Sequence, residues 1–302
     1  MSVIEWNAVT KKFGRVQALD GFSLRVGAGV HCLLGANGAG KSTALSVLTG
    51  ARRPDEGSVT VDGIVVRRGG MAARAVGSQP QSVSFPQTLK VREVVDFVGR
   101  HYPDRLSTTE VLAAVGLEHC ADRLCGGLSG GETRRLGLAC ALVGRSRVVI
   151  LDEPVAGLDR DGQELLHKLI RQRGEAGDVV IVSSHDLLEI ESIADRLSLV
   201  AHGRVVATGS VDDIRGGLRW RRVEFDGDHD PTRAAVSQID PNGTVEELRP
   251  GSGRPSRISV LTYDADAVAR YVLETWSHPR INVREPSLAE AVDALASIGI
   301  ER

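Results

Sequence analysis

Long apolar runs are absent from this sequence of 302 residues. Its apolar runs, such as residues 148–151 and 179–182, are far shorter than the roughly 18 consecutive apolar residues that cross a bilayer. An excess of basic charge is also absent, because 37 Lys and Arg face 39 Asp and Glu. The sequence therefore excludes a chain that forms a membrane channel by itself, and we expect no nucleic-acid partner.

Aromatic residues, lysine and cysteine are scarce. Aromatics are 4% of the residues, and only five of the 37 basic residues are lysines, so a retained lysine raises the question of what arginine could not do there. The N-terminus lacks the basic and apolar regions of a signal peptide, so we expect the four cysteines to be reduced thiols. His119, Cys120 and Cys125 lack the paired spacing of a zinc site, and we expect no metal there.

Short apolar runs alternate with helical patterns through the first 216 residues. Residues 30–34, 147–151 and 179–183 read as buried strands, while 42–49 and 161–173 read as helices. This alternation of strands and helices predicts a parallel sheet and an α/β fold.

Other elements are expected around this sheet. Residues 3–6 and 24–26 read as short strands, and residues 59–66 alternate like a hairpin. Helices are expected at 91–100 and 107–115, and the second opens with Ser-Thr-Thr-Glu, a capping box.

The composition shifts after Gly216 and Gly217, and residues 218–302 read as a small α+β accessory domain. Residues 250–256 read as a loop, because Pro, Gly and Ser dominate them. The expected accessory elements are strands at 220–225, 257–262 and 280–284, and helices at 265–276 and 287–296.

The strongest chemical motif is the segment 35–43, Gly-Ala-Asn-Gly-Ala-Gly-Lys-Ser-Thr, which fits the phosphate-binding loop (P-loop) pattern between a predicted strand and helix. Its glycines let backbone N–H groups turn towards a phosphate, and the helix start adds the positive end of a dipole. Lys41 supplies a compact charge to the β- and γ-phosphates, and Ser42 supplies a hydroxyl for Mg²⁺. The expected nucleotide-binding residues here are Gly35, Asn37, Gly38, Gly40, Lys41, Ser42 and Thr43.

A second motif is the apolar strand 148–151 followed by Asp152 and Glu153. Two carboxylates at the end of a strand can divide the work of hydrolysis. Asp152 can hold Mg²⁺ through water, and Glu153 can polarise the attacking water as a general base. The pair lies far enough from Lys41 in the sequence to occupy a different strand of the same sheet.

A third motif, Leu128-Ser129-Gly130-Gly131-Glu132, opens a helix expected at about 131–144. Ser-Gly-Gly at a helix start is a second phosphate cradle. One γ-phosphate does not need two cradles from one chain, whereas two chains facing head to tail would supply one each. With this motif the chain resembles the ATP-binding-cassette ATPases, whose signature these residues match.

The resemblance covers about residues 1–216 and implies an architecture. The family fold is a P-loop NTPase core with a mostly parallel sheet, an antiparallel β subdomain and a helical subdomain, here at about 84–145. Residues 218–302 would follow it as the accessory domain. The cofactors implied are ATP and Mg²⁺.

The resemblance also implies roles for residues that mean little alone. Phe13 matches the aromatic residue under the adenine ring, and Gln81 matches the glutamine that couples Mg²⁺ and the γ-phosphate to the helical subdomain. Asp159 matches the aspartate that contacts the partner cassette, and His185 matches the histidine that orients the attacking water. The expected catalytic residues are Lys41, Gln81, Glu153 and His185, the expected metal ligands are Ser42, Gln81 and Asp152, and the expected second cradle is Ser129, Gly130 and Gly131.

Several positions depart from the family pattern without removing a catalytic group. Val155 stands where Thr or Ser is common, and Arg160 stands where Pro is usual. Ser78 and Gln79 replace aromatic and aliphatic residues, so Gln79 competes with Gln81 for the role of the coupling glutamine. The signature continues as Glu132-Thr133-Arg134-Arg135.

One P-loop and one signature predict that the working unit is a homodimer or a pair with a related cassette. The short stretch between the motifs has no coiled coil like that of chromosome-maintenance relatives, and translation-associated relatives carry two cassettes on one chain. A transporter subunit that acts with a separate integral-membrane permease is the favoured interpretation. Its expected location is the cytoplasm, at the inner face of the cell membrane.

Residues 284–292, Arg-Glu-Pro-Ser-Leu-Ala-Glu-Ala-Val, resemble the ending of exporter subunits of the daunorubicin-resistance type. This resemblance implies ATP-driven export of a small molecule such as a drug, an antibiotic or a lipid-like compound. An ordinary amphipathic helix is the alternative interpretation of this segment. An importer subunit, or a stand-alone ATPase that acts on a soluble partner in regulation or self-immunity, are the alternative functions. In the last case Arg219, Arg221 and Arg222 would form a contact patch, whereas a solvated strand edge is the simpler interpretation.

Overall fold

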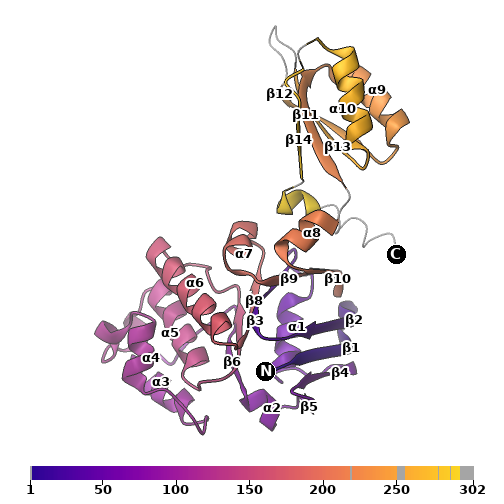
Figure 1. The fold of residues 1–302 in the computed structure, drawn as a ribbon. Coiled ribbons are helices and arrows are strands. Elements are labelled where there is room, and N and C mark those ends of the chain that lie inside the picture. Colours follow the sequence, from indigo (N-terminus) through magenta and orange to yellow (C-terminus); the bar gives the residue numbers. More distant parts are fainter. Residues whose placement is uncertain (1, 218–219, 250–255, 278, 286, 293–302) are drawn as a thin grey trace. The chain divides into compact units, whose positions relative to one another are not determined.

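The computed structural model describes residues 2–217, 220–249, 256–277, 279–285 and 287–292. It divides into two compact units, residues 1–211 and 212–301 (Figure 1). The division falls slightly before residue 216, where the composition shift placed it. Among the described residues, no helix combines the length and the apolar composition that a membrane span requires.

An antiparallel sheet opens the first unit, with strand order β2-β1-β4-β5. The sequence predicted only short strands at 3–6 and 24–26, but these strands extend into one long hairpin. Polar residues alternate with buried ones such as Trp6, Val9 and Phe22, so one face of the hairpin packs in the core while the other faces solvent. The hairpin expected at 59–66 is confirmed. The four strands are β1 (Ile4–Phe13), β2 (Val16–Val26), β4 (Glu56–Val61) and β5 (Ile64–Val65).

The central sheet has strand order β10-β9-β3-β8-β7-β6 and is parallel except for the β9–β10 hairpin. Every residue of β7 and β8 is buried, as expected for strands covered on both faces. Because β8 pairs with both β3 and β7, the P-loop after β3 and the carboxylates at the end of β7 flank the end of β8. The strands are β3 (Gly29–Leu34), β6 (Val76–Gln79), β7 (Val148–Asp152), β8 (Val179–Ser184), β9 (Arg196–Ala201) and β10 (Arg204–Gly209).

Helices follow the strands of the first unit, and three of them, α3, α4 and α5, pack on one another as the expected helical subdomain (Figure 1). The capping box expected before α4 is present: Ser107 N–H donates to Glu110 at 2.8 Å, and Glu110 N–H donates to the Ser107 hydroxyl at 3.2 Å. The helices are α1 (Lys41–Leu48), α2 (Met71–Arg74), α3 (Val91–Gly99), α4 (Thr108–Ala114), α5 (Gly130–Leu142), α6 (Arg160–Glu175) and α7 (Leu187–Ile193), with 3-10 turns η1 (Glu118–Cys120) and η2 (Cys125–Gly127).

The second unit has the β-α-β-β-α-β order of a ferredoxin-like fold, with an antiparallel sheet in the order β12-β13-β11-β14. Val223, Phe225, Ile258 and Val260 form its apolar core with residues of α9 and α10. The sequence predicted β11, β13, β14 and α10 but not α8, α9 or β12. The elements are α8 (Val211–Gly217), β11 (Arg221–Gly227), α9 (His229–Ile239), β12 (Thr244–Arg249), β13 (Ser256–Thr262), α10 (Ala265–Thr275) and β14 (Asn282–Arg284).

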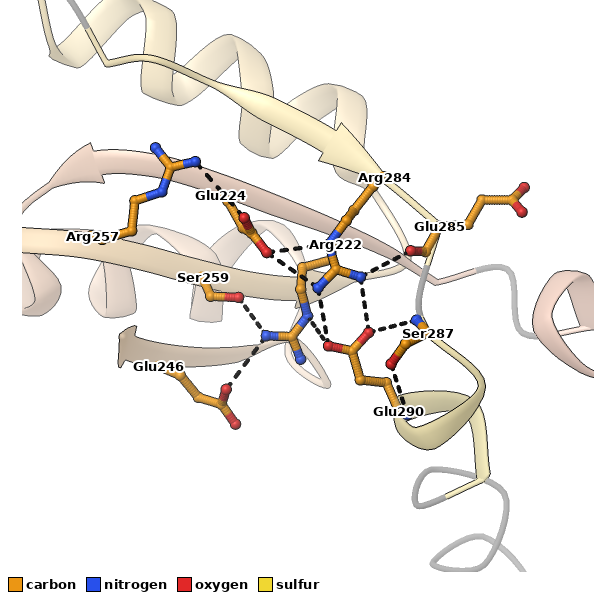
Figure 2. Close-up of polar contacts among 9 residues, drawn as sticks. All are labelled: Arg222, Glu224, Glu246, Arg257, Ser259, Arg284, Glu285, Ser287 and Glu290. Carbon is orange, nitrogen blue, oxygen red and sulfur yellow. Dashed lines mark hydrogen bonds and ion pairs between the residues drawn. The ribbon is translucent and has the colours of Figure 1, made fainter. Parts of the chain in front are cut away.

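A network of ion pairs covers the other face of this sheet (Figure 2). Alternation along β11 sends Val223 and Phe225 to the core and Arg222 to the opposite face. Arg222 Nε lies 2.7 Å from a carboxylate oxygen of Glu290, and Nη1 lies 3.4 Å from Glu246. The second partner of Glu290 is Arg284, at 3.1 Å, and this arginine also pairs with Glu224 (Figure 2).

Glu290 belongs to the segment that resembles an exporter ending. Residues 288–292 are helical, and Ser287 and Glu290 exchange hydrogen bonds of 2.7 and 3.3 Å at the start of that helix. Residues 293–296 of the expected helix lie outside the described residues, as do Arg219 and residues 250–255 of the expected loop. Arg222 is only 8% exposed, so it belongs neither to a contact patch nor to a solvated strand edge.

Candidate functional site

The P-loop lies between β3 and α1, the context that the motif requires. Gly40 caps α1 with a positive φ of 111°, and a Cβ there would lie 2.6 Å from the carbonyl oxygen of Ala18, so only glycine fits. Lys41 is buried, and its Nζ donates to the carbonyl oxygens of Gly35 at 2.5 Å and Ala36 at 3.2 Å. The loop therefore holds its one ammonium group close to its own backbone.

Ser42, in the first turn of α1, meets Asp152, the last residue of β7. The Ser42 hydroxyl donates to Asp152 Oδ1 at 3.1 Å, and the Ser183 hydroxyl donates to the same carboxylate oxygen. Hydroxyl and carboxylate oxygens are the hard ligands that Mg²⁺ prefers. The donor set at Ser42 and Asp152 therefore fits a magnesium ion.

Glu153 lies next to both a cation and an imidazole. Its Oε2 is 2.7 Å from His185 Nδ1, and its Oε1 is 3.8 Å from Lys41 Nζ. Burial lowers the pKa of Lys41, while the charges of Glu153 and Asp152 raise it and so favour the ammonium form. This contact set brings together four residues that the sequence placed in the site: Lys41, Ser42, Asp152 and Glu153, with His185 at the edge.

The backbone of Glu153 is unusual, with a φ of 51° in the left-handed region. For a residue other than glycine this conformation costs on the order of 1–2 kcal/mol. Its N–H donates to the Ser183 hydroxyl at 3.0 Å and to the Ser183 carbonyl at 3.1 Å, and its carbonyl accepts from Arg134. Surrounding hydrogen bonds thus hold this strained peptide at the point where the chemistry is expected.

The signature residues begin α5. Ser129 is the N-cap, and it exchanges hydrogen bonds of 2.7 and 3.2 Å with Glu132 in a capping box. A Cβ at Gly131 would lie 3.7 Å from the carbonyl oxygen of Gly157, so the start of α5 lies beside the loop that precedes α6. The second cradle is therefore a helix N-terminus whose first turn is fixed by side-chain hydrogen bonds.

Glu132 also belongs to a cluster with His119, Cys120 and Arg123. The ligand atoms of His119, Cys120 and Glu132 all lie within 4.8 Å of one another, but Arg123 Nη1 lies 2.8 Å from Glu132 and 3.2 Å from the Cys120 sulfur. Hydrogen bonds, first that from Ser129 N–H, lower the pKa of Glu132 to about 2. Arg123 thus compensates the charge of the Glu132 carboxylate, and it stabilises the segment that leads into α5. Cys125, which the sequence grouped with His119, is not part of this cluster.

The two candidate coupling glutamines differ in position. Gln79 is 1% exposed at the end of β6, and its amide donates to the Arg134 carbonyl at 3.1 Å. Gln81 is exposed in the loop after β6, and its backbone carbonyl accepts from Arg134. The Gln79 side chain is buried against α5 and hydrogen-bonded to it, so it is not available to bind Mg²⁺. Gln81 stays the predicted metal ligand.

Two other expected residues lie apart from the cluster of contacts around Glu153. Phe13 ends β1 and is 38% exposed, and the Arg52 guanidinium lies 4.8 Å from the ring centroid. Asp159 is exposed and caps α6 by accepting from Gly162 N–H at 2.9 Å. Their predicted roles, under the adenine ring and against a partner cassette, stay predictions.

Sequence reasoning missed Ser183 and Arg134. Ser183 contacts both carboxylate-bearing residues, and Arg134 contacts the backbone of Glu153 and Gln81. A polar Ser-Ser pair that ends an otherwise apolar strand was the available signal for Ser183. The Arg134-Arg135 pair was visible as a departure from the signature pattern, but its contacts were not.

Glu189 on α7 should make the stability of the folded chain depend on pH. Burial is the main cause that raises its pKa from 4.5 to about 7, although the Ser184 hydroxyl donates to it at 2.5 Å; Asp186 and Glu153 add repulsion. The folded chain therefore keeps a proton that the unfolded chain releases between about pH 4.5 and 7, so the stability due to Glu189 falls as pH rises through that window. Glu189→Gln should raise the free energy of unfolding at pH 8 by about 1–3 kcal/mol.

Denaturant unfolding at pH 4 and pH 8 measures this difference. Near pH 4 the variant and the wild type should have similar stabilities, because the protonated glutamate and the glutamine at position 189 are then both neutral. Glu175→Gln, at an exposed position of α6, is the matched control and should change neither value. A Glu189→Gln chain that is no more stable than wild type at pH 8 contradicts the prediction.

The chain resembles known proteins in both sequence and fold. A family model described as ABC transporter matches residues 19–156. The chain is 35% identical over 224 residues to the daunorubicin resistance ATP-binding protein DrrA2 of Streptomyces coeruleorubidus, covering 72% of this chain and 70% of that protein. It is 37% identical over 217 residues to the Nod factor export ATP-binding protein I of Rhizobium sp. strain N33, covering 68% of this chain and 70% of that protein.

A solved structure has a fold similar to that of this chain. The dimeric post-hydrolysis state of an ATP-binding cassette bound to ADP and phosphate aligns with a TM-score of 0.60 and 26% identity. The alignment covers 68% of this chain and 98% of that one.

Proposed function

Because this chain belongs to the ABC transporter family, as an ATPase subunit that couples ATP hydrolysis to transport, we propose that it powers export of a small molecule through a separate membrane permease. The observation that carries the catalytic part is the direct contact of Glu153 with His185 and Lys41 beside the Ser42–Asp152 pair. Relatives named for drug resistance and Nod factor export support the direction of transport.

The side chains of the site divide the work of hydrolysis. Ser42 and Asp152, with Gln81, would hold Mg²⁺, which supplies positive charge to the phosphate oxygens when it is bound. The Lys41 ammonium neutralises charge on the β- and γ-phosphates. Glu153 accepts a proton from the attacking water, and His185, 2.7 Å from its carboxylate, orients that carboxylate.

The second cradle acts on the nucleotide of another cassette. Ser129, Gly130 and Gly131 present the N-terminus of α5, a site for the γ-phosphate bound to the P-loop of a partner. A two-fold pair of chains would then form two composite sites. Closing the pair would move the helical subdomain, including α3, α4 and α5, and so pass the energy of ATP binding to a permease. We propose that this takes place in the cytoplasm, at the inner face of the cell membrane.

A mixture of two inactive variants tests the composite site. Lys41→Ala damages the P-loop, and Ser129→Arg blocks the signature, so each variant alone should hydrolyse little ATP. In an equal mixture, half of the dimers contain one intact composite site, and about one quarter of wild-type activity should return. The measurement is steady-state phosphate release as the two chains are titrated against each other.

The control mixture combines Lys41→Ala with Glu153→Gln, which damage the same side of the composite site and should not complement. Recovery in this control, or no recovery in the first mixture, would contradict a site shared between two chains. A neighbouring gene for a protein of several membrane spans would favour a permease partner over the soluble-partner alternative.

A further inference from the structure

Arg134 is a buried cation that the proposed chemistry does not use. It lies in the second turn of α5, and only 9% of it is exposed. Burying an arginine costs free energy unless its donors are satisfied and nearby charge compensates it. Its partners should therefore explain why the charge is there.

The partners of Arg134 come from two loops at the end of the central sheet. Nη1 donates to the carbonyl oxygen of Gln81, and Nη2 donates to the carbonyl oxygen of Glu153. In return, the Arg134 carbonyl accepts from the Gln79 amide at 3.1 Å. One guanidinium group thus joins the signature helix, the loop after β6 and the loop after β7.

Only a planar fork can make this pair of contacts. The two nitrogens of the guanidinium are fixed relative to each other, so they hold the carbonyls of Gln81 and Glu153 at a set separation. The carboxylates of Asp152 and Glu153 favour the charged form against the cost of burial. A lysine at this position would keep the charge but lose the fork.

The contact with Glu153 falls on the strained peptide. Glu153 has a φ of 51°; Ser183 accepts from its N–H, and Arg134 donates to its carbonyl. Because the peptide is held from both sides, the direction of the Glu153 side chain depends on the position of α5.

We propose that Arg134 is a positioning residue that couples the signature helix to the catalytic carboxylate. A shift of α5 moves the guanidinium, and the guanidinium carries the Gln81 loop and the Glu153 peptide with it. The inference rests on the proposed function, because it assigns Arg134 a role through Glu153 as the general base.

The test compares Arg134→Lys and Arg134→Gln with the full-length wild-type chain. Losing the fork should lower kcat by about 10- to 100-fold, because small displacements of a catalytic group have effects of that size. The KM for ATP should stay within about threefold, because Arg134 does not contact the P-loop residues that bind it. Arg173→Lys is the matched control: Arg173 also donates to a backbone carbonyl, that of Ser146, but it touches none of the three motifs.

A cycle with Glu153→Gln separates positioning from general structural damage. If Arg134 acts through Glu153, Arg134→Lys should cause no further loss of kcat when Glu153 is already glutamine. An additive loss in the double variant, an unchanged kcat in Arg134→Lys, or an equal loss in Arg173→Lys would each overturn the inference. Failure of the proposed function gives a different result, which is near-normal turnover by Glu153→Gln alone.

Discussion

Replacing Glu153 with glutamine should lower ATP turnover by about 10²- to 10⁴-fold, the usual contribution of a general base. Glutamine keeps the size of the side chain but cannot take a proton from water at neutral pH. Nucleotide affinity should change little, because the P-loop glycines, Ser42 and Asp152 are untouched. With ATP present, the variant should accumulate as a dimer, because binding closes the pair while hydrolysis no longer opens it.

Steady-state phosphate release and size-exclusion chromatography with ATP measure the two effects. Glu164→Gln is the matched control, because this carboxylate is 68% exposed on α6 and pairs with Arg160, which is itself exposed. It should keep wild-type turnover. Turnover by Glu153→Gln within a few-fold of wild type would rule out the general-base assignment.

The second large effect concerns stability. Arg222→Ala should lower the free energy of unfolding of the second unit by about 3 kcal/mol, because removing one partner of a buried pair leaves the other charge without compensation. The Arg222 side chain is 9% exposed, and that of Glu290, its closest charged partner, is 21% exposed. The change also removes hydrogen bonds to Ser259 and Glu246 (Figure 2).

Denaturant unfolding of the full chain measures the loss, and it is followed by tryptophan fluorescence, to which Trp276, packed against the core of the second unit, contributes. Arg280→Ala is the control, because its side chain is 86% exposed and lies 3.9 Å from Asp226. Arg222→Met combined with Glu290→Gln should recover part of the stability, since both charges are then removed. Equal stabilities of Arg222→Ala and Arg280→Ala would show that the network contributes little.

The sequence predicted the first unit well where pattern and motif agreed. The segments 30–34, 147–151 and 179–183 are mostly apolar, because the strands in them are buried on both faces, and this made them recognisable. The family, the P-loop NTPase fold and ATP hydrolysis followed from motifs and are confirmed by the comparisons. The long β1–β2 hairpin was underestimated, because residues such as Asn7 and Arg25 are polar in a strand with one solvated face.

Two elements of the second unit, α9 and β12, were hard to predict because their local sequences favour helix or strand only weakly. Helix α9 contains Pro231 near its start and few apolar residues, and β12 carries Glu246 and Glu247 side by side. Pairing with β13 and packing of α9 against β12 and β13 override these weak local preferences. Tertiary contacts of this kind cannot be read from a window of sequence.

The site residues also divide into those that the sequence predicted and those that it missed. Lys41, Ser42, Asp152 and Glu153 lie in motifs whose chemistry is local, so sequence alone named them. Ser183 and Arg134 act through hydrogen bonds to residues on other elements, and nothing near them in the sequence records those partners. A residue that positions another is visible only once the sheet and α5 are in place.

The Arg222–Glu290 pair has a consequence for the order in which the chain can mature. It joins the first strand of the second unit to the segment 287–292, which is synthesised after every strand of that sheet. Synthesis delivers residues one after another, and domains fold as units as they emerge. The ATPase unit is therefore complete first, the sheet of the second unit forms next, and the charged face of that sheet is closed last.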